Sequence, residues 1–535
     1  MIQINNLTYR YPNSTQPVLV DVNLKIAPGT MTLISGASGS GKSTLLRCIN
    51  GLVPHFTGGF IQGEIMVFDH NPIRSGPVKL AEIVGYVFQE PEAQFVFDEV
   101  EPEIAFSLEN AGVEKYEMQK KVDQIIDSLQ LNSIRHMKIR DLSGGEKQKV
   151  AIASAIVNHP KVLIFDEPTS QLDVQTADNF LQFLTNLTSK FGLTTLIAEH
   201  RLERLLPYVD TIAHITKDHH LIYGPPRKIL PQLDLIPPIV KIAQGFHLSP
   251  IPLSVEEFHN KFSGLVKTEN PIKTIVSSVD SLPLLQIDQL STDILDQNIL
   301  NDISFNLNQS EILVVIGPNG SGKTTLIRSI LGLIHSDGKR DLFGKNMEQM
   351  KISSIIKHIA YLPQNPNDLL FADSIIEELK LTLKNHHQLK TDAQLIEFLE
   401  PFGLAKQYNR YPRDLSIGEC QRTAIAAITI HDPEIIILDE PTRGLDYNTK
   451  KDLTNLLKNW RNQGKAIIVV THDVEFAARL ADRVLIIEKG EIQFIGLPHV
   501  AFKQFEMYRT QTSQLFPESN AIIPQEILPN EEIGN

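Results

Sequence analysis

The sequence predicts an α/β protein made of two tandem copies of one domain, each with a mainly parallel sheet. An ordered set of short motifs occurs twice along the 535-residue chain, which indicates an internal repeat. Apolar runs of strand length, such as VLIF and IIIL, alternate with spans of helical length. This alternation is typical of a parallel sheet that helices cover on both faces. The chain is also too long for one ordinary domain, so two domains are expected.

The composition is that of a globular protein. Hydrophobic residues make up 42% and charged residues 21% of the chain, which are ordinary values for such proteins. The net charge of -13, from 50 Lys and Arg against 63 Asp and Glu, argues against a protein whose whole surface binds nucleic acid. Cys48 and Cys420 are the two cysteines, too few for a disulfide framework or a zinc site, which favours a reduced, cytosolic setting.

Targeting and membrane segments are not expected from the sequence. The start MIQINNLTYRYP has neither a basic region nor a long apolar region, so it does not resemble a signal peptide. The longest apolar runs are far shorter than the ~20 residues that cross a bilayer. If the protein works at a membrane, we expect other subunits to span it.

The repeated motifs keep one order and a nearly constant separation. GASGSGKST (residues 36–44) returns as GPNGSGKTT (residues 317–325), and YVFQEP (residues 86–91) returns as YLPQNP (residues 361–366). LSGGEKQ, VLIFDEPTSQLD and IAEH return as LSIGECQ, IIILDEPTRGLD and VVTHD. The pattern indicates tandem duplication of a whole domain.

The repeat sets the expected domain limits. The two copies should occupy residues 1–224 and 284–505. Residues 225–283 are rich in proline with short apolar groups, which predicts a small helical appendage and a linker. Residues 506–535 form a polar tail, whose last part is expected to be loosely ordered.

Each glycine-rich motif has the form of a phosphate-binding loop. Gly41-Lys42-Ser43 follows an apolar strand and opens a helix, so backbone N–H groups and the helix N-terminus would face phosphate oxygens. Lys42 would neutralise the outer phosphates, and the Ser43 hydroxyl would ligate Mg²⁺. The residues expected to bind phosphate are Gly36, Gly39, Gly41, Lys42, Ser43 and Thr44 in the first copy and Gly317, Asn319, Gly320, Gly322, Lys323, Thr324 and Thr325 in the second.

An Asp-Glu pair ends an apolar strand in each copy, as Asp166-Glu167 and Asp439-Glu440. Such a pair lies at the carboxyl edge of the sheet, where ligand sites of α/β proteins form. The aspartate would hold Mg²⁺ through water, and the glutamate would orient and polarise an attacking water. A lone pair could be a solvated strand end, but its position after a phosphate loop and before Pro-Thr favours the functional interpretation.

Gln89 and Gln364 follow short apolar runs, and His200 and His472 close apolar strands. Alone, each glutamine would be an ordinary surface amide and each histidine a structural residue. Their common order in both copies favours a role in the site.

In this order the motifs resemble the nucleotide-binding domain of ABC ATPases. The resemblance covers nearly all of the chain outside the linker and tail. It implies two P-loop NTPase domains, each with a parallel sheet core, an antiparallel β subdomain and a helical subdomain. It further implies that the two domains pair head to tail within one chain and hold two ATP with Mg²⁺, each between the phosphate loop of one domain and the signature motif (LSGGEKQ or LSIGECQ) of the other.

The resemblance also assigns roles to individual residues. It implies catalytic roles for Glu167, Glu440, His200, His472, Gln89 and Gln364. It implies Mg²⁺ ligation by Ser43, Gln89 and Asp166 in one site and by Thr324, Gln364 and Asp439 in the other. It implies that the site of Lys323 is closed by Ser143, Gly144 and Gly145, and the site of Lys42 by Ser416 and Gly418.

Each site is expected to carry one departure from the family pattern. Ile417 replaces a signature glycine, which would bring a β-branched side chain to a turn expected to be crowded; tolerated drift is an equal alternative. Tyr11 matches the family's adenine-stacking aromatic, whereas the second copy has Ile294. We therefore expect the Lys42 site to retain nucleotide better and the Lys323 site to hydrolyse it faster.

Residues 84–106 and 198–210 resemble the ATPases of energy-coupling-factor (ECF) importers, which take up vitamins or transition-metal ions. That resemblance implies two partners, a transmembrane coupling protein and a small substrate-binding membrane protein, and a cytoplasmic position at the inner face of the membrane. The acidic residues that match the docking helix of that family are Asp98, Glu99, Glu101 and Glu103. A solvated helix face is the alternative for this run.

Other ABC ATPases remain open as alternatives. Sugar-type importers are the nearest. ABC-F translation factors also have two such domains, but they use a long, strongly basic interdomain arm suited to RNA, whereas this linker is proline-rich. Repair ATPases insert long coiled coils, and no sustained heptads interrupt either copy. Nucleic acid is therefore not an expected partner, and the transported substrate is not identifiable from this chain.

Overall fold

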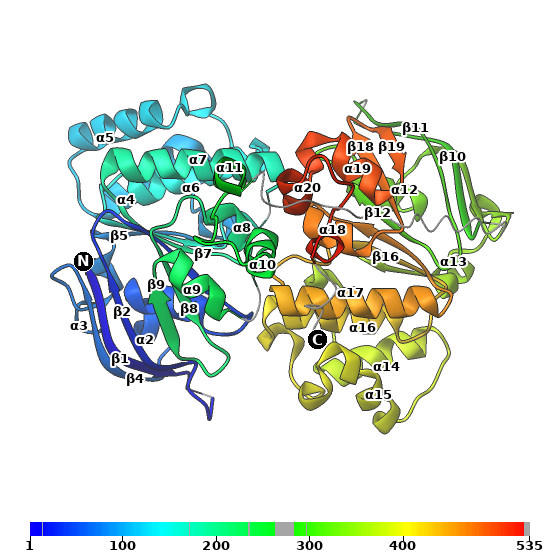
Figure 1. The fold of residues 1–535 in the computed structure, drawn as a ribbon, viewed down its shortest axis with the longest axis horizontal. Coiled ribbons are helices and arrows are strands. Elements are labelled where there is room, and N and C mark those ends of the chain that lie inside the picture. Colours follow the sequence, from blue (N-terminus) through cyan, green and yellow to red (C-terminus); the bar gives the residue numbers. More distant parts are fainter. Residues whose placement is uncertain (13, 171, 234–235, 263–282, 296, 529–535) are drawn as a thin grey trace. The chain divides into compact units, whose positions relative to one another are not determined.

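The computed structural model describes the chain except for residues 13, 171, 234–235, 263–282, 296 and 529–535. The chain forms two compact units, Met1–Phe258 and His259–Asn535, and each is described separately (Figure 1). Part of the expected linker and the end of the expected tail lie outside the described residues.

The core of the first unit is a six-stranded sheet. Its order is β5 (Val84–Val87), β6 (Val162–Asp166), β7 (Thr194–Ala198), β3 (Met31–Gly36), β8 (Thr211–Ile215) and β9 (Leu221–Gly224). All neighbours are parallel except β8 and β9. Strands β6 and β7 are buried along their whole length, as continuous apolar strands in a covered parallel sheet should be. Because β3 and β6 run parallel, their carboxyl ends meet at one edge.

Two smaller layers flank the core sheet of the first unit. A three-stranded antiparallel sheet has the order β2 (Leu19–Ile26), β1 (Ile2–Arg10) and β4 (Phe60–Val67). The helices are α1 (Lys42–Ile49), α2 (Leu52–His55), α3 (Pro72–Leu80), α4 (Val100–Asn110), α5 (Lys115–Ser128), α6 (Gly144–Ile156), α7 (Val174–Phe191) and α8 (Leu202–Leu205), with 3₁₀ turns η1 (Pro91–Gln94), η2 (Asn132–Ile134) and η3 (Ile139–Asp141). In Figure 1 the antiparallel strands and helices α4 to α6 lie at opposite ends of the unit.

Helix α1 shares one core with the antiparallel sheet. Leu45 and Leu46 of α1 pack in the same buried cluster as Ile4 of β1, Leu24 of β2 and Ile65 of β4. This core fixes the start of α1 between the two sheets.

The second unit repeats this architecture. Its six-stranded sheet has the order β15 (Ile359–Leu362), β16 (Ile435–Asp439), β17 (Ala466–Val470), β12 (Ile312–Ile316), β18 (Arg483–Glu488) and β19 (Glu491–Gly496). Its antiparallel sheet has the order β11 (Gln297–Leu307), β10 (Leu285–Ile294), β13 (Asp337–Leu342) and β14 (Lys345–Asn346). The predicted fold class, two α/β domains with an added antiparallel sheet and helices, is confirmed.

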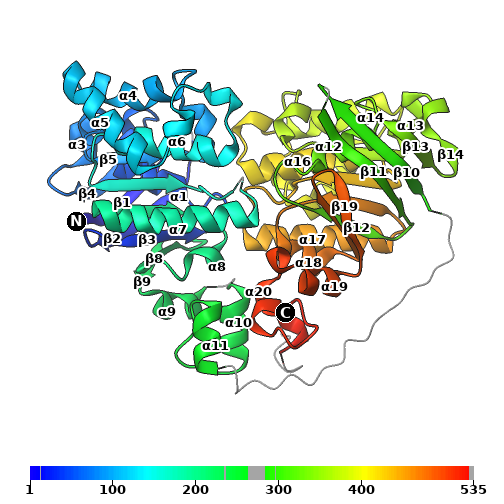
Figure 2. The same cartoon turned by 90° about the horizontal axis from the view of Figure 1, so that it is seen from above.

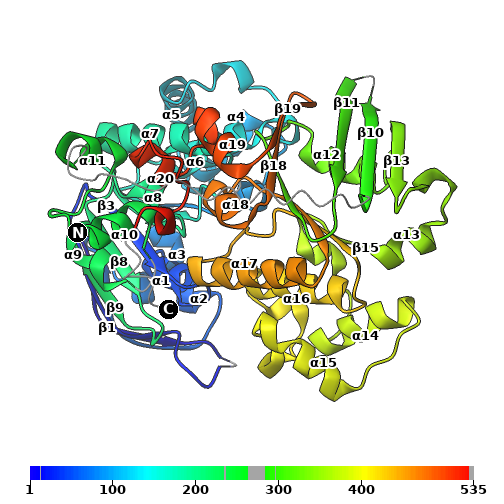
Figure 3. The same cartoon turned by 45° about the vertical axis from the view of Figure 1, so that its right-hand side comes forward.

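The second unit also repeats the helical layer. Its helices are α12 (Lys323–Ile330), α13 (Ile352–His358), α14 (Ile375–Asn385), α15 (Asp392–Phe398), α16 (Ile417–Thr429), α17 (Tyr447–Asn462) and α18 (Val474–Leu480), with 3₁₀ turns η5 (Met347–Gln349), η6 (Pro366–Leu369), η7 (Glu400–Phe402), η8 (Ala405–Gln407) and η9 (Pro412–Asp414). Figure 3 shows β10, β11 and β13 on one side of this unit and α14 to α16 on another. Across the described residues of both units, no helix combines the length and the apolar character needed to cross a membrane.

Each unit ends in a small helical extension after its last strand. In the first unit these elements are α9 (Pro226–Ile229), η4 (Leu230–Gln232), α10 (Pro238–Gly245) and α11 (Val255–Phe262), seen beyond β9 in Figure 2. In the second unit they are α19 (Pro498–Gln504), η10 (Glu506–Tyr508), α20 (Gln511–Leu515) and η11 (Pro524–Glu526). The first extension groups with the first unit as far as Phe258, and the tail is packed through buried Leu515 and Ile522. The domain limits expected from the sequence remain predictions.

A stacked histidine pair gives the second unit a predictable response to acid. His386, beyond α14, and His431, beyond α16, stack with ring centroids 3.7 Å apart and planes 16° apart. Burial lowers the pKa of His431 to about 4 and also lowers the pKa of His386. Between pH ~6.5 and ~4 the unfolded chain therefore binds more protons than the folded unit, so stability falls as the pH falls through this window.

We expect acidification from pH 7.5 to 5 to cost the second unit on the order of 2 kcal/mol through His431, or roughly 5 °C in melting temperature. His431→Phe keeps the ring stack and should remove most of this loss. The exposed neighbour His387 offers a control, His387→Phe, which should keep it. Calorimetry at the two pH values measures the difference, and equal pH slopes for wild type and His431→Phe would contradict the prediction.

Candidate active site

The phosphate loop of the first unit joins β3 to α1. Gly41 has a left-handed φ of 108°, and a Cβ there would lie 2.7 Å from the Val18 carbonyl oxygen, so only glycine fits. Lys42 is buried and its Nζ donates to the carbonyl oxygens of Gly36 and Ala37, both at 3.1 Å. The ammonium is thus folded over the loop, where the N–H groups of the helix start also lie.

The second unit builds the same loop between β12 and α12. Lys323 Nζ donates to the carbonyl oxygens of Gly317 and Pro318, at 2.9 and 2.7 Å. Gly322 has φ 99°, and a Cβ there would lie 2.8 Å from Leu300 Cδ2. Both loops therefore present a positive group and a helix N-terminus to one cradle, which suits a phosphate.

A hydroxyl and a carboxylate meet beside each loop. Ser43 Oγ donates to Asp166 Oδ1 at 3.0 Å, and Thr324 Oγ1 donates to Asp439 Oδ2 at 2.9 Å. Burial raises the pKa of Asp166 and raises that of Asp439 to about 6.

These residues fit Mg²⁺. A buried carboxylate with a raised pKa is one that a cation would stabilise, and hydroxyl and carboxylate oxygens are the donors Mg²⁺ prefers. The described residues hold no cluster of three or more His, Cys, Asp or Glu that could bind a metal.

A glutamate and a histidine face each other at the next position of each sheet edge. His200 Nε2 lies 3.0 Å from Glu167 Oε1, and His472 Nδ1 lies 2.8 Å from Glu440 Oε2. All four side chains are buried. Both glutamates have left-handed backbones, with φ of 51° and 52°. Such backbone strain is common where a side chain must be aimed at a functional site.

The two predicted glutamines differ. Gln89 Nε2 donates to Glu167 Oε2 at 2.9 Å, so it joins the glutamate and histidine of its unit. Gln364 is exposed and makes no corresponding contact with Glu440 within the described part of the chain. The structure therefore brings three of the predicted groups together in the first unit and two in the second.

The signature residues begin helices. Ser143 caps α6 through a capping box with Glu146, and Ser416 caps α16 through one with Glu419. Gly144 and Gly145 are the first two residues of α6, and Gly418 is the second of α16. Each signature thus presents the N-terminus of a long helix, a favourable place for an anion.

Tyr11 lies beside the phosphate-loop helix of the first unit. Its hydroxyl is 3.0 Å from Thr44 Oγ1, and its ring meets Tyr9 edge-on with centroids 5.0 Å apart. Ile294 in the second unit is 41% exposed at the end of β10. These contacts hold Tyr11 near the loop; its stacking on adenine stays a prediction.

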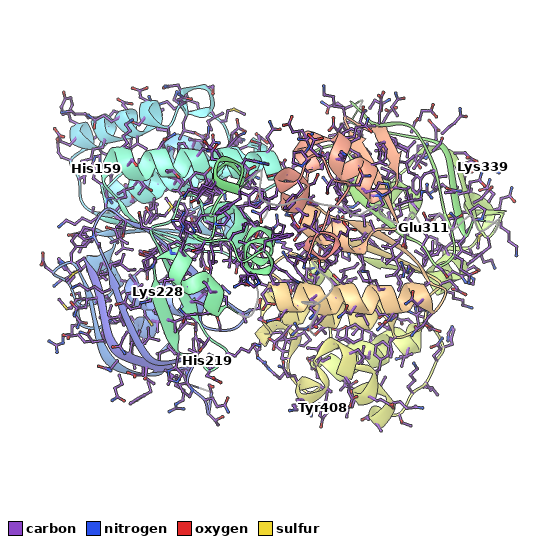
Figure 4. The ribbon with its side chains drawn as sticks, in the orientation of Figure 1. His159, His219, Lys228, Glu311, Lys339 and Tyr408 are labelled. Atoms are coloured by element: carbon purple, nitrogen blue, oxygen red, sulfur yellow. The ribbon has the colours of Figure 1, made fainter. Side chains whose placement is uncertain are left out.

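Two site residues were not found from the sequence. The Tyr86 hydroxyl donates to Asp166 Oδ2 at 3.1 Å; because Tyr86 recurs as Tyr361 in the repeated motif, the repeat could have revealed it. His219 Nδ1 lies 3.2 Å from the Ser40 carbonyl oxygen of the phosphate loop (Figure 4). No repeated residue signalled His219, because the second unit makes this contact with the backbone N–H of Gly490, which donates to the Ser321 carbonyl oxygen at 3.2 Å.

The segments that contain the phosphate loops, acidic pairs and signatures also match a known protein family. The family model of the ABC transporter matches residues 19–170 and 300–443. The chain belongs to the ABC transporter family. It is a two-domain ABC ATPase, and its domains bind ATP for hydrolysis.

Relatives of this ABC ATPase extend over most of its length. A protein of Streptomyces avermitilis, provisionally named an ABC transporter ATP-binding protein, is 34% identical over 92% of this chain and 93% of its own. A protein of Bacillus subtilis, provisionally named the HMP/thiamine import ATP-binding protein YkoD, is 30% identical over 94% of this chain and 93% of its own. A solved structure titled as a model of ribosome-bound archaeal Pelota and ABCE1 has a TM-score of 0.64 at 22% identity, covering 94% of this chain and 80% of that chain. This last likeness shows the fold alone.

Proposed function

We propose that this ABC ATPase is the motor subunit of an ECF-type importer for a vitamin, a vitamin precursor or a transition-metal ion. The observation that carries the proposal is an exposed apolar and acidic segment at residues 96–99, after the 3₁₀ turn that follows Gln89. The similarity to YkoD over nearly the whole chain supports it, because the name of that protein describes an import ATPase.

The hydrolytic step is assigned to the buried residues at each sheet edge. Glu167 or Glu440 accepts a proton from water as its oxygen attacks the γ-phosphorus, and the ADP oxygen leaves with the electrons of the broken bond. His200 or His472 holds the glutamate carboxylate in place. Lys42 or Lys323 neutralises the phosphate oxygens. Bound Mg²⁺, held by Ser43 and Asp166 or by Thr324 and Asp439, would supply further neutralisation of phosphate charge.

We also propose that the ATP sites are composite. Ser143, Gly144 and Gly145 would close the site of Lys323, and Ser416 and Gly418 would close the site of Lys42. The capped helix starts support this arrangement, because their N–H groups suit the outer phosphate.

The docking segment (residues 96–99) is the surface proposed to meet the membrane partner. Val96 is 62% and Phe97 39% exposed, and Asp98 and Glu99 are exposed beside them. An apolar and acidic surface of this kind suits a partner helix with apolar and basic residues.

Glu101 and Glu103 do not belong to this surface. Glu103 is buried, and its Oε2 accepts from the backbone N–H groups of Val96 and Phe97 at 2.8 and 2.9 Å. Glu101 pairs with Arg135, which lowers the pKa of that carboxyl to about 2. The expectation of four docking carboxylates is therefore wrong for these two, because tertiary contacts already satisfy them.

The second unit has a matching segment after Gln364. Glu378 is buried and accepts from the backbone N–H of Ala372, as Glu103 does in the first unit. Phe371 is 74% exposed beside the exposed Asp373. A second docking surface is thus proposed at residues 371–373.

Reversing charge in the docking segment tests the proposal. We expect Asp98→Lys/Glu99→Lys to reduce recovery of membrane proteins with the tagged chain at least tenfold, because like charges would face a basic partner. Glu114→Lys/Glu117→Lys makes the same charge change at exposed positions of the helical layer and should leave recovery unchanged. ATP turnover of the isolated chain should stay within about twofold in both variants.

The wild-type pull-down also separates the classes of ABC ATPase. Membrane proteins of a coupling and a substrate-binding type are expected. Ribosomes in their place would overturn the importer proposal, and equal recovery from the two charge variants would place docking elsewhere.

A further inference from the structure

Ile417, the signature residue that departs from glycine, is the first residue of α16. It follows Ser416, whose side chain caps the helix, and it is 44% exposed. Its backbone conformation is not left-handed, unlike that of several other described residues. Isoleucine can therefore adopt it without strain.

The matching glycine of the first unit, Gly144, is not required by its backbone conformation, which is not left-handed. Among the described residues, a Cβ added at Gly144 would meet nothing within 4 Å. The backbone conformation therefore does not account for the difference between Gly144 and Ile417.

Ile417 packs instead against the turn that follows the Asp-Glu pair of its own unit. Gly444 in this turn has a left-handed φ of 68°, and a Cβ there would lie 2.8 Å from Ile417 Cγ2 and 3.4 Å from Ile417 Cβ. The Ile417 side chain thus fills the space that a side chain at position 444 would need.

The large residue and the small residue of this pair change places between the two units. The second has Ile417 and Gly444, and the first has Gly144 and, by sequence, Gln171, which lies outside the described residues. A large residue at one position goes with a glycine at the other in both copies. In the second unit this pattern agrees with the contact between Ile417 and position 444.

The turn at Gly444 is tied to Glu440. The Arg443 N–H donates to the Glu440 carbonyl oxygen at 3.3 Å, and the Leu445 N–H donates to the Thr442 carbonyl oxygen at 3.2 Å. Asp446 then caps α17 through the Thr449 N–H at 2.8 Å. A displacement at the start of α16 would therefore press on a tight turn that begins at the glutamate.

We propose that Ile417 and Gly444 are a packed pair of positioning residues that couples the signature of the second unit to Glu440. The proposal rests on the composite sites proposed above, in which this signature closes the Lys42 site while Glu440 serves the Lys323 site. ATP at one site then biases hydrolysis at the other through α16, Ile417 and the turn.

A double-mutant cycle on the purified full chain tests the pair. Gly444→Ala should lower kcat at least fivefold, because the new Cβ meets Ile417. In the Ile417→Gly background only the strain of the left-handed backbone remains, so Gly444→Ala should lower kcat there by no more than about twofold. If the two substitutions change kcat independently, so that their effects multiply in the double variant, the proposed pair is wrong.

Cooperativity in ATP concentration provides the readout that a purely structural role would not move. Wild type should show a Hill coefficient clearly above 1, and Ile417→Gly should bring it close to 1 with little change in melting temperature. Ile352→Gly, the same substitution at the exposed first residue of α13, should leave the coefficient unchanged. A coefficient of 1 in wild type, or one that Ile417→Gly does not alter, would overturn the proposal. These assays need no membrane partner. A failed pull-down would therefore contradict the importer proposal and leave the proposed pair of Ile417 and Gly444 unaffected.

Discussion

Replacing Glu167 and Glu440 together with glutamine will reduce ATP turnover at least 100-fold while ATP affinity changes by less than about threefold. Each carboxylate is the group proposed to take a proton from the attacking water, and loss of such a base typically costs 10²–10⁴ in rate. Glutamine keeps the size of the side chain, and Lys42, Ser43 and Asp166, with their counterparts in the second unit, still bind the phosphates and Mg²⁺. Steady-state phosphate release and equilibrium binding of ATP measure the two effects.

A matched control exists at another buried glutamate. Glu311 accepts from Arg483 at 2.8 Å and from the Asn308 N–H at 2.7 Å, away from the phosphate loop (Figure 4). Glu311→Gln should lower the melting temperature but retain turnover within about threefold. If the double variant of Glu167 and Glu440 hydrolyses ATP at the wild-type rate, the roles assigned to these carboxylates are wrong.

Removing both loop lysines will have the largest effect on binding. Lys42→Ala/Lys323→Ala should weaken ATP binding at least 100-fold, because charge-assisted hydrogen bonds to phosphate are the strongest in the cradle. Each single variant should lose one of two bound nucleotides in calorimetry. Lys339→Ala, at an exposed lysine that pairs with Asp341 at 2.6 Å, should keep both. Two nucleotides bound to the double variant would contradict the assignment of the loops.

The sequence predicted the parts of the site that lie close together along the chain. A phosphate loop is a strand, a turn and a helix start in one short segment, so its glycines, lysine and hydroxyl are recognisable without tertiary information. The Asp-Glu pair is recognisable because a buried parallel strand must end at the ligand edge of the sheet. The repeat then confirmed the order and gave the fold class of both units.

The predictions that were wrong concern residues whose contacts come from distant segments of the chain. Glu103 was expected on a docking surface, but it is buried under the segment that precedes its own helix. Glu101 was expected beside it, but Arg135 from a later segment binds it. Local charge pattern cannot distinguish a solvated carboxylate from one that is already paired.

Ile417 shows the same limit for packing. Its expected effect was crowding within the signature turn, whereas its partner Gly444 belongs to another motif. His219 likewise supports the phosphate loop from a hairpin of unrelated sequence. In each case the partner follows from the fold and not from the neighbouring residues.

The two site histidines present different ring nitrogens to their glutamates, and this has a chemical consequence. A carboxylate only accepts hydrogen bonds, so a neutral ring must carry its hydrogen on Nε2 in His200 and on Nδ1 in His472. The two imidazoles are then opposite tautomers. The ring nitrogen that faces away from the glutamate is Nδ1 in one site and Nε2 in the other. Two sites with the same residue types therefore differ in the histidine atom that is turned away from the carboxylate.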